Sequence, residues 1–340
     1  MSSDLLTAEP PSDLAAYEGG AISGAVNLPG SGGDALVHEP TSRVVSVDTS
    51  VSTMLRDFVE LTKPRILTMI LVTTGATALV GAAGWVPMAD MLLLLLGTGL
   101  VAGSAGAANQ IWERVIDTRM PRTAVRPLPS GRMSVATATW FMGSIGTLGT
   151  AVLWLGFGAT PALVGLATWM SYVFLYTPMK TRTSWNTTVG AVAGALPMLI
   201  GYTATGGMLT DGVAWMLFGV LAAWQYPHFM AIAWLYRQQY AEAGFEMSTT
   251  VEPTGRSAAA QSIAGSLAVI GCGVGLCFIS PGVVVGSVAA VAVVLATVPM
   301  LRASVAFARD RNDGTARRML RSSLLVLPAV LAVVTLRVFW

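Results

Sequence analysis

Two long uncharged stretches constrain the fold more than any other feature. Residues 133–179 and 257–301 contain no Asp, Glu, Lys or Arg. A membrane-spanning helix needs about 20 apolar residues, so each stretch is long enough for two spans joined by a turn. Only 11% of the chain is charged, against about 25% in soluble domains. The pattern predicts an integral membrane protein.

The same pattern, followed along the chain, predicts an all-α protein with nine transmembrane helices around a central cavity. A closed barrel is not expected, because alternating segments of about ten residues are absent from the sequence. The expected spans lie near residues 66–84, 90–110, 134–154, 158–177, 186–204, 213–234, 260–279, 282–300 and 320–338.

Residues 1–50 differ in composition from the rest. They carry Gly, Ser and Pro clusters and seven acidic residues against one base, Arg43. Such a segment predicts a disordered tail preceding a membrane domain at 51–340. It lacks the basic and apolar regions of a secretory signal, and it is too acidic for a transit peptide. These features favour a bacterial cytoplasmic (inner) membrane.

The basic residues predict the orientation. With nine spans, nearly all Lys and Arg outside the tail fall in the segment before the first span and in the loops after spans 2, 4, 6 and 8. The opposite loops hold none apart from Arg337 near the C-terminus. This asymmetry predicts a cytoplasmic N-terminus, an external C-terminus and a functional site on the cytoplasmic side.

One segment combines acidic and basic side chains at the end of a predicted span. Asn109, Glu113 and Asp117 recur every four residues, which would place them on one helical face. Oxygen ligands of this kind suit Mg²⁺, and guanidinium groups suit phosphate oxygens. The segment therefore predicts a diphosphate site with its apolar tail in the membrane; the alternative is a solvated helix end with ordinary ion pairs. The interleaved or following bases are Arg114, Arg119, Arg122, Arg126 and Arg132.

Other function classes find little support. A net charge of +2 does not predict a nucleic-acid partner. Two cysteines, Cys272 and Cys277, are too few for a disulfide framework or a thiolate metal site, and we interpret them as packing residues.

Several ordered motifs resemble one family. Asn109-x3-Glu113-x3-Asp117, followed by the run from Met120 to Pro127, closely resembles the first acidic motif of the intramembrane aromatic prenyltransferases, the UbiA superfamily. The resemblance covers about residues 55–335. Pro227-His228-Phe229 and the Met120 to Pro127 run are most similar to the branch whose acceptor is protohaem IX. Further matching segments are Leu61 to Arg65, Tyr176 to Arg182, Asn186 with Gly194 to Pro197, and Tyr240 to Met247.

The resemblance implies transfer of a farnesyl group from farnesyl diphosphate to a vinyl group of protohaem IX, with water addition and release of diphosphate. It assigns Asn109, Glu113 and Asp117 to Mg²⁺ and His228 to catalysis. It implies membrane lipid as surroundings and names haem A synthase or a terminal oxidase as candidate partner proteins. The implied diphosphate ligands are Arg119, Arg122, Arg126, Lys180 and Arg182, and the implied acceptor or pocket residues are Lys63, Arg65, Tyr176, Asn186 and Tyr240.

The sequence departs from the family at its second acidic motif. Family members of this branch usually place an acid just before the tyrosine, where this chain has Gln238 and Gln239 before Tyr240. Either Glu242 or Glu246 supplies the second metal ligand, or that metal position is weakened.

Three other functions remain open at this point. A related enzyme could prenylate a quinone precursor or another aromatic acceptor. An ion-coupled transporter could use Glu113 and Asp117 as coupling residues, although no repeat of two halves is visible. A non-catalytic assembly factor is suggested by Gln238 and Gln239.

Overall fold

The computed structural model of the chain describes residues 51–279 and 282–339. Within these ranges every regular element is helical, which confirms the predicted all-α fold. The expectations for the tail at residues 1–50 and for the turn at Ser280-Pro281 fall outside the described residues. The elements are α1 (Val51–Leu61), α2 (Pro64–Gly81), α3 (Met88–Glu113), η2 (Ile116–Arg119), α4 (Pro121–Ala124), α5 (Val135–Phe157), α6 (Ala159–Met170), η3 (Ser171–Tyr176), α7 (Thr177–Met179), α8 (Asn186–Ala204), α9 (Gly212–Leu235), α10 (Arg237–Ala243), α11 (Ser248–Val251), α12 (Arg256–Phe278), α13 (Val283–Arg309), α14 (Asp313–Leu336) and η4 (Arg337–Phe339).

The predicted transmembrane helices are confirmed. In the described part of the chain, nine helices are long and apolar enough to cross a membrane, and each overlaps one predicted span. One of them, Ala159–Met179, joins α6, η3 and α7 into a continuous rod. The predicted central cavity stays a prediction.

The last two spans differ from prediction at their shared end. The sequence predicts a loop between residues 300 and 320, whereas α13 continues to Arg309 and α14 already begins at Asp313. Charged residues end an apolar span, but they do not end a helix. The start of α14 is fixed by Asn312, whose side chain accepts a hydrogen bond from the Thr315 N–H at 2.9 Å.

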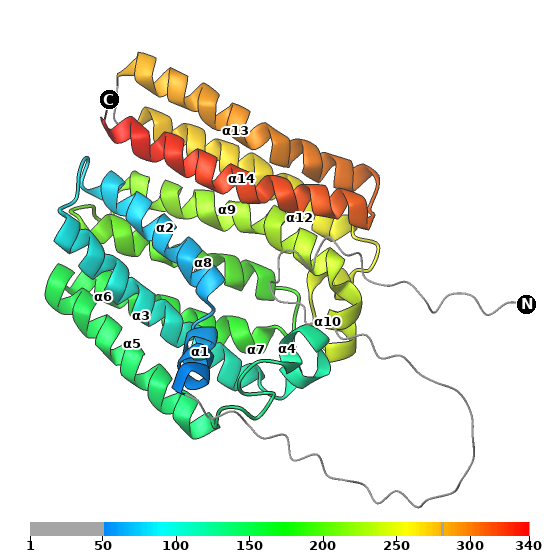
Figure 1. Ribbon diagram of the computed structural model, residues 1–340. Coiled ribbons are helices and arrows are strands. Elements are labelled where there is room, and N and C mark those ends of the chain that lie inside the picture. Colours follow the sequence, from blue (N-terminus) through cyan, green and yellow to red (C-terminus); the bar gives the residue numbers. More distant parts are fainter. Residues whose placement is uncertain (1–50, 280–281, 340) are drawn as a thin grey trace, which may run out of the picture. The chain divides into compact units, whose positions relative to one another are not determined.

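Helices α8 and α9 lie at the centre of the bundle (Figure 1). Helix α8 contacts α2, α6 and α9, while α9 contacts α12 and α14 as well. Small residues allow these backbones to approach closely. At Gly201 of α8, an added Cβ would lie 2.1 Å from the Thr74 carbonyl oxygen and 2.3 Å from Thr77 Oγ1 of α2. The α2–α8 spacing therefore depends on the absence of a side chain at this position.

The short helices α1, α4, α7 and α10 gather at one end of this bundle (Figure 1), which we call the basic end. Helix α1 contacts α3 and α5, η2 contacts α4 and α10, and α7 contacts α3. The connections at this end carry Lys63, Lys180, Arg237 and the arginine-rich run from Arg114 to Arg132. Elements far apart in sequence thus bring their polar side chains together just beyond the apolar helices.

The close α2–α8 contact yields a stability prediction. Gly201→Ala should lower the free energy of unfolding by about 1–3 kcal/mol, because the added methyl group meets backbone and hydroxyl oxygens that cannot move away freely. Gly271→Ala in α12 is the matched control, since a methyl group added there would meet no atom of another helix within 4 Å. Thermal unfolding in detergent measures both variants, and equal midpoints would contradict the packing account.

Candidate active site

The acidic segment does not form one continuous helix, contrary to the sequence prediction. Helix α3 ends at Glu113, and Asp117 lies in the 3₁₀ helix η2. Pro121 has no N–H to donate to the carbonyl oxygen of Asp117 four residues earlier. That oxygen instead accepts from the Met120 N–H at 3.4 Å and from the Thr123 hydroxyl at 2.8 Å. Helix α3 has already ended at Glu113, and Asp117 reaches the site from a separate element.

Each of the three predicted oxygen ligands is buried and held by a basic side chain. The exposed fractions of Asn109, Glu113 and Asp117 are 0%, 7% and 1%. Lys63 Nζ donates to Asn109 Oδ1. Lys180 Nζ lies 2.8 Å from Glu113 Oε1, and Arg126 Nη1 lies 2.8 Å from Asp117 Oδ2. We call these six residues the polar cluster: Lys63, Asn109, Glu113, Asp117, Arg126 and Lys180.

A π-helix lies beside the polar cluster. Helix η3 spans Ser171–Tyr176, and Thr177 follows it with its hydroxyl 2.9 Å from the Tyr172 carbonyl oxygen. The same Thr177 hydroxyl accepts a hydrogen bond from Asn109 Nδ2 at 2.9 Å. Wider π turns often occur at functional sites. Here the turn is tied directly to the first predicted metal ligand.

Two tyrosines of η3 contact the cationic side chains. Lys180 Nζ lies 4.7 Å from the ring centroid of Tyr176. Lys63 Nζ lies 6.0 Å from the ring centroid of Tyr172. The negative face of an aromatic ring stabilises a nearby cation. The arrangement therefore supplies aromatic faces where positive charge is already held.

The two lysines differ in their electrostatic surroundings. Burial alone would lower the pKa of Lys180, but attraction to the Glu113 carboxylate outweighs burial and raises the pKa above its usual value. Lys180 therefore stays an ammonium group. Lys63 pairs with a neutral amide, and burial lowers the pKa of Lys63 below its usual value. Of the two, Lys63 is held less firmly as a cation.

The segment carrying the unusual glutamines lies beside the polar cluster. The guanidinium carbon of Arg122 lies 5.4 Å from the ring centroid of Tyr236. Burial raises the pKa of the Tyr240 hydroxyl, four residues further along. The Glu246 N–H donates to the Lys180 carbonyl oxygen at 2.7 Å. Asn186 Nδ2 donates to the Glu246 carbonyl oxygen at 2.8 Å. This backbone contact places Glu246 next to the cluster, and the side chains of both Glu242 and Glu246 are exposed.

Several predicted site residues lie away from these contacts. Arg65, Arg119 and Arg182 are exposed. His228 Nδ1 lies 3.0 Å from Ser323 Oγ of α14, and its ring stacks on Trp224 at 4.7 Å. The described contacts of His228 thus join α9 to α14. Its role in catalysis stays a prediction, as do the roles assigned to the three arginines.

Sequence reasoning missed Tyr172, Thr177 and Tyr236 as neighbours of the site. The spacing of Tyr172 and Tyr176, four residues apart and followed by Thr177-Pro178, was the available signal. Two further aromatic side chains near the site sequence motifs have other surroundings: the hydroxyl of Tyr226 in α9 donates to Thr188 Oγ1 at 3.1 Å. Trp112 is half exposed, on a different face of α3 from Glu113.

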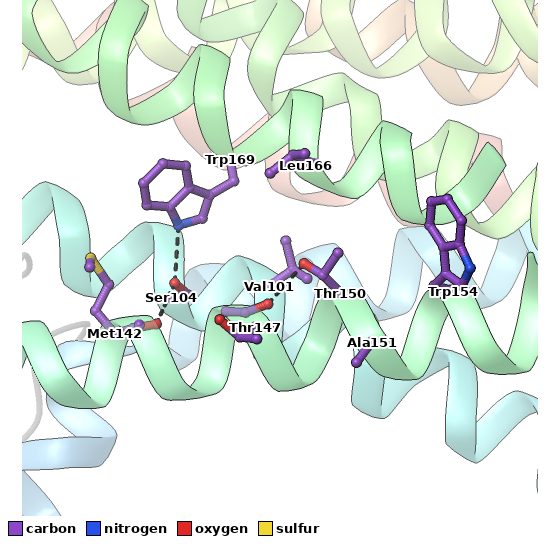
Figure 2. A pocket seen from close by; sticks show the side chains of 11 residues that line it. Val101, Ser104, Met142, Thr147, Thr150, Ala151, Trp154, Leu166 and Trp169 are labelled. Atoms are coloured by element: carbon purple, nitrogen blue, oxygen red, sulfur yellow. Dashed lines mark hydrogen bonds between the residues drawn. The ribbon is translucent and has the colours of Figure 1, made fainter. Parts of the chain in front are cut away.

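Two cavities of about 580 and 420 Å³ lie outside the polar cluster. They share Met142 and Trp169 and are bordered by α3, α5, α6 and η3. Figure 2 shows the Trp169 indole directed at Ser104, whose hydroxyl it contacts at 3.0 Å. The lining is mainly apolar, and none of the six cluster residues contributes to it. These cavities are therefore separate from the polar cluster, and the one basic side chain that borders the smaller cavity is Arg114.

Comparison with known proteins defines the class. The sequence pattern of the UbiA prenyltransferase family matches residues 69–325. The chain belongs to this family. It is similar to the protoheme IX farnesyltransferase of Rhodopirellula baltica, with 62% identity over 283 residues that cover 82% of this chain and 99% of the relative.

Solved structures agree on the fold. A digeranylgeranylglyceryl phosphate synthase matches with a TM-score of 0.70 and 13% identity, covering 84% of this chain and 99% of its own. A UbiA homologue from Archaeoglobus fulgidus bound to DMAPP and Mg²⁺ matches with a TM-score of 0.61 and 14% identity, covering 82% and 99%. At these identities the likeness shows a common fold.

The buried Glu113–Lys180 pair yields a second stability prediction. Lys180→Met should lower the free energy of unfolding by about 3–5 kcal/mol, because it leaves the Glu113 carboxylate buried without a counter-charge. Adding Glu113→Gln should recover most of that loss. Thermal unfolding in detergent measures both, with the exposed Arg182→Met as control. No recovery in the double variant would show that the pairing is not what holds these segments together.

Proposed function

We propose that this chain transfers the farnesyl group of farnesyl diphosphate to a vinyl group of protohaem IX, with the polar cluster as the site that holds the diphosphate. The observation that carries the proposal is the set of three buried oxygen-bearing side chains, each matched to a cation, at the basic end of a membrane bundle. Similarity to protoheme IX farnesyltransferases over most of the chain supports the choice of acceptor.

Mg²⁺ fits the donor set. Glu113 and Asp117 offer two carboxylates and Asn109 an amide oxygen, and Mg²⁺ usually takes one or two carboxylates together with substrate phosphates. Among the described residues no group of three or more His, Cys, Asp or Glu could hold a metal ion by itself, so the Asn109 amide oxygen and substrate oxygens would have to complete the coordination. When bound, the ion would neutralise negative charge on the departing diphosphate. A fold neighbour is bound to DMAPP and Mg²⁺.

When diphosphate binds, the basic residues of the polar cluster would exchange the cluster oxygens for diphosphate oxygens as hydrogen-bond partners. In the structure the three basic side chains donate hydrogen bonds to the cluster oxygens: Lys63 to Asn109, Arg126 to Asp117 and Lys180 to Glu113. Diphosphate oxygens accept from the same ammonium and guanidinium groups, so these side chains can turn from the cluster oxygens to the substrate. Arg122 adds a further donor, since its buried Nε has no hydrogen-bond partner in the described part of the chain. Arg119 and Arg182, both exposed, are proposed to guide the diphosphate inward.

The chemical balance is simple. The C–O bond of farnesyl diphosphate breaks, a C–C bond forms to the terminal vinyl carbon of protohaem, and the hydroxyl of water adds to the adjacent carbon. Diphosphate and one proton are released. The farnesyl group carries positive charge as the C–O bond breaks, and the faces of Tyr172 and Tyr176 are placed to stabilise it. Burial of Asn109, Glu113 and Asp117 would keep water away from the reacting carbons until the new bond has formed.

The second acidic motif is proposed to be replaced rather than lost. Glu246 is bound through its backbone to both Lys180 and Asn186, whereas Glu242 lies in α10 without such a tie to the cluster among the described contacts. A rotation of the exposed Glu246 side chain would bring a carboxylate toward the cluster. We therefore prefer Glu246 to Glu242 as a further metal ligand. Tyr240 and Asn186 are assigned to the pocket wall.

The basic end is proposed to face the cytoplasm of a bacterium, with the chain in the inner membrane. Lys and Arg concentrate on the cytoplasmic side of membrane proteins, and the connections of this end carry nearly all of them. Anionic lipid heads on that side would attract the same residues, including the exposed Arg65. Haem A synthase or a terminal oxidase would receive the product.

The metal assignment predicts the outcome of one substitution. Asp117→Asn should reduce haem farnesylation by at least about 100-fold, since a charged ligand and its electrostatic contribution are lost, while the protein remains folded in the membrane. Asp90→Asn, a similar change at the other, exposed end of α3, should keep full activity. Mass spectrometry of haem extracted from cells lacking their own enzyme provides the measurement. Near-normal product with Asp117→Asn would remove this residue from the metal site.

His228 can be tested against its observed partner. We expect His228→Ala to raise KM for protohaem about tenfold and to change KM for farnesyl diphosphate less than about twofold. Ser323→Ala keeps the imidazole but removes its hydrogen bond to α14, and should leave both values near those of the native protein. If the two variants behave alike, His228 only joins the helices.

A further inference from the structure

The turn between α1 and α2 has an unusual backbone. Lys63 has φ 55° and ψ 65°, in the left-handed region, and it precedes Pro64. A residue before proline favours extended conformations, and a non-glycine residue in the left-handed region is strained. The Lys63 carbonyl also starts α2, because it accepts from the N–H groups of Ile66 and Leu67 at 3.0 and 3.1 Å. The turn has one hydrogen bond of its own at this residue, from the Lys63 N–H to the Glu60 carbonyl oxygen at 3.2 Å, and contacts from outside the turn are needed to offset the strain.

Gln110 of α3 supplies such contacts. Its side-chain amide donates to the carbonyl oxygens of Glu60 and Leu61 at 3.0 and 3.1 Å. These are the last carbonyls of α1, which lack partners within their own helix. One turn earlier in α3, Gly106 lets the turn approach, since an added Cβ would lie 3.1 Å from the Thr62 carbonyl oxygen. Helix α3 thus contacts the backbone immediately before Lys63 through the Gln110 hydrogen bonds and the close approach at Gly106.

Stability alone does not explain an amide at this position. Gln110 is 1% exposed, and its Oε1 is buried without a hydrogen-bond partner in the described residues. Rotating the amide would turn that oxygen toward two carbonyl oxygens, so the unpaired oxygen cannot be avoided. An unpaired buried acceptor is costly. An apolar side chain of similar size would bury no such atom but would release the turn.

We propose that Gln110 is a positioning residue that acts through Lys63. It holds the α1–α2 turn in the left-handed conformation that directs the Lys63 ammonium to Asn109, the residue next to Gln110 in α3. Without these hydrogen bonds, Lys63 relaxes toward the extended backbone favoured before proline, and its ammonium leaves the polar cluster. The consequence for catalysis rests on the proposed function, in which Lys63 binds diphosphate.

The test uses the only two lysines of the chain, Lys63 and Lys180. Reductive methylation of the detergent-purified, full-length protein modifies accessible amines, and peptide mass spectrometry reports the rate at each lysine. In Gln110→Leu, the rate at Lys63 should rise on the order of tenfold, while that at Lys180 changes less than about twofold. An unchanged rate at Lys63, or an equal rise at both lysines, would overturn the proposal.

A second variant and a control sharpen this result. Gly106→Ala pushes on the same turn through the Thr62 carbonyl without touching the amide, and it should also raise the methylation rate of Lys63 alone. Gln261→Leu removes another glutamine amide, which donates to Ser248 Oγ and Ser257 Oγ at 3.0 and 2.9 Å. It should change neither lysine. A response of Lys63 to Gln261→Leu would show that the assay reports general loosening and would overturn the proposal.

Measurements of catalytic activity test the proposal independently of the methylation rates. Gln110→Leu should lower kcat/KM for farnesyl diphosphate about tenfold in the native background and less than about twofold in a Lys63→Met background, because its effect passes through Lys63. Additive losses would contradict the proposal. A native protein that makes no farnesylated haem would count against the proposed function alone, because the methylation arm requires no turnover.

Discussion

The buried ion pair between Glu113 and Lys180 is the interaction on which the rest of the site depends. A carboxylate at the end of a membrane helix is costly unless a counter-charge and hydrogen bonds accompany it. Lys180 lies 67 residues further along the chain, and its Nζ supplies the counter-charge at 2.8 Å from Glu113 Oε1. The pair therefore fixes the end of α3 against the end of the Ala159–Met179 rod. Once these ends are joined, the π turn of η3 places Tyr172 and Tyr176 beside the cations, and Thr177 binds Asn109.

The same principle explains why the site can exchange partners. Each acidic or amide oxygen already has a basic neighbour, so both carboxylates are matched by a cation, and only the charge of Lys63, which pairs with a neutral amide, is left unbalanced. In the proposed function, a metal ion and a diphosphate would bring opposite charges, which would allow the cluster oxygens and the basic groups to separate without leaving a buried charge unpaired. The segment after α9 packs beside the cluster, because the Glu246 N–H donates to the Lys180 carbonyl oxygen and the Asn186 side-chain amide donates to the Glu246 carbonyl oxygen. In the proposed function, the charged side chains that stabilise the site are also those that bind the diphosphate and the metal ion.

Much of this could be predicted from the sequence. Long uncharged stretches determine the nine spans, because only a helix satisfies its backbone within the bilayer, and the confirmed family follows from the Asn109 to Pro127 motifs. The breaks between elements were harder. The spacing of four residues predicts one helix through Asp117, whereas α3 ends at Glu113. The Asp117 carbonyl oxygen accepts from the Met120 N–H and the Thr123 hydroxyl, because Pro121 has no N–H to donate. The pairing of Lys63 with Asn109 depends on the left-handed turn and on Gln110, and neither leaves a periodic signal in the sequence. The partner of His228 on α14 was likewise invisible, since it arises from packing between distant segments.

The central claim is that the polar cluster holds the diphosphate. The most direct measurement is an experimental structure of the protein with Mg²⁺ and a non-hydrolysable thio analogue of farnesyl diphosphate. The account predicts a metal ion on Glu113 and Asp117, with diphosphate oxygens within hydrogen-bond distance of Lys180 and Arg126. Lys63 should have moved from Asn109 toward the ligand. A diphosphate bound elsewhere, with the Glu113–Lys180 and Asp117–Arg126 pairs intact, would contradict it.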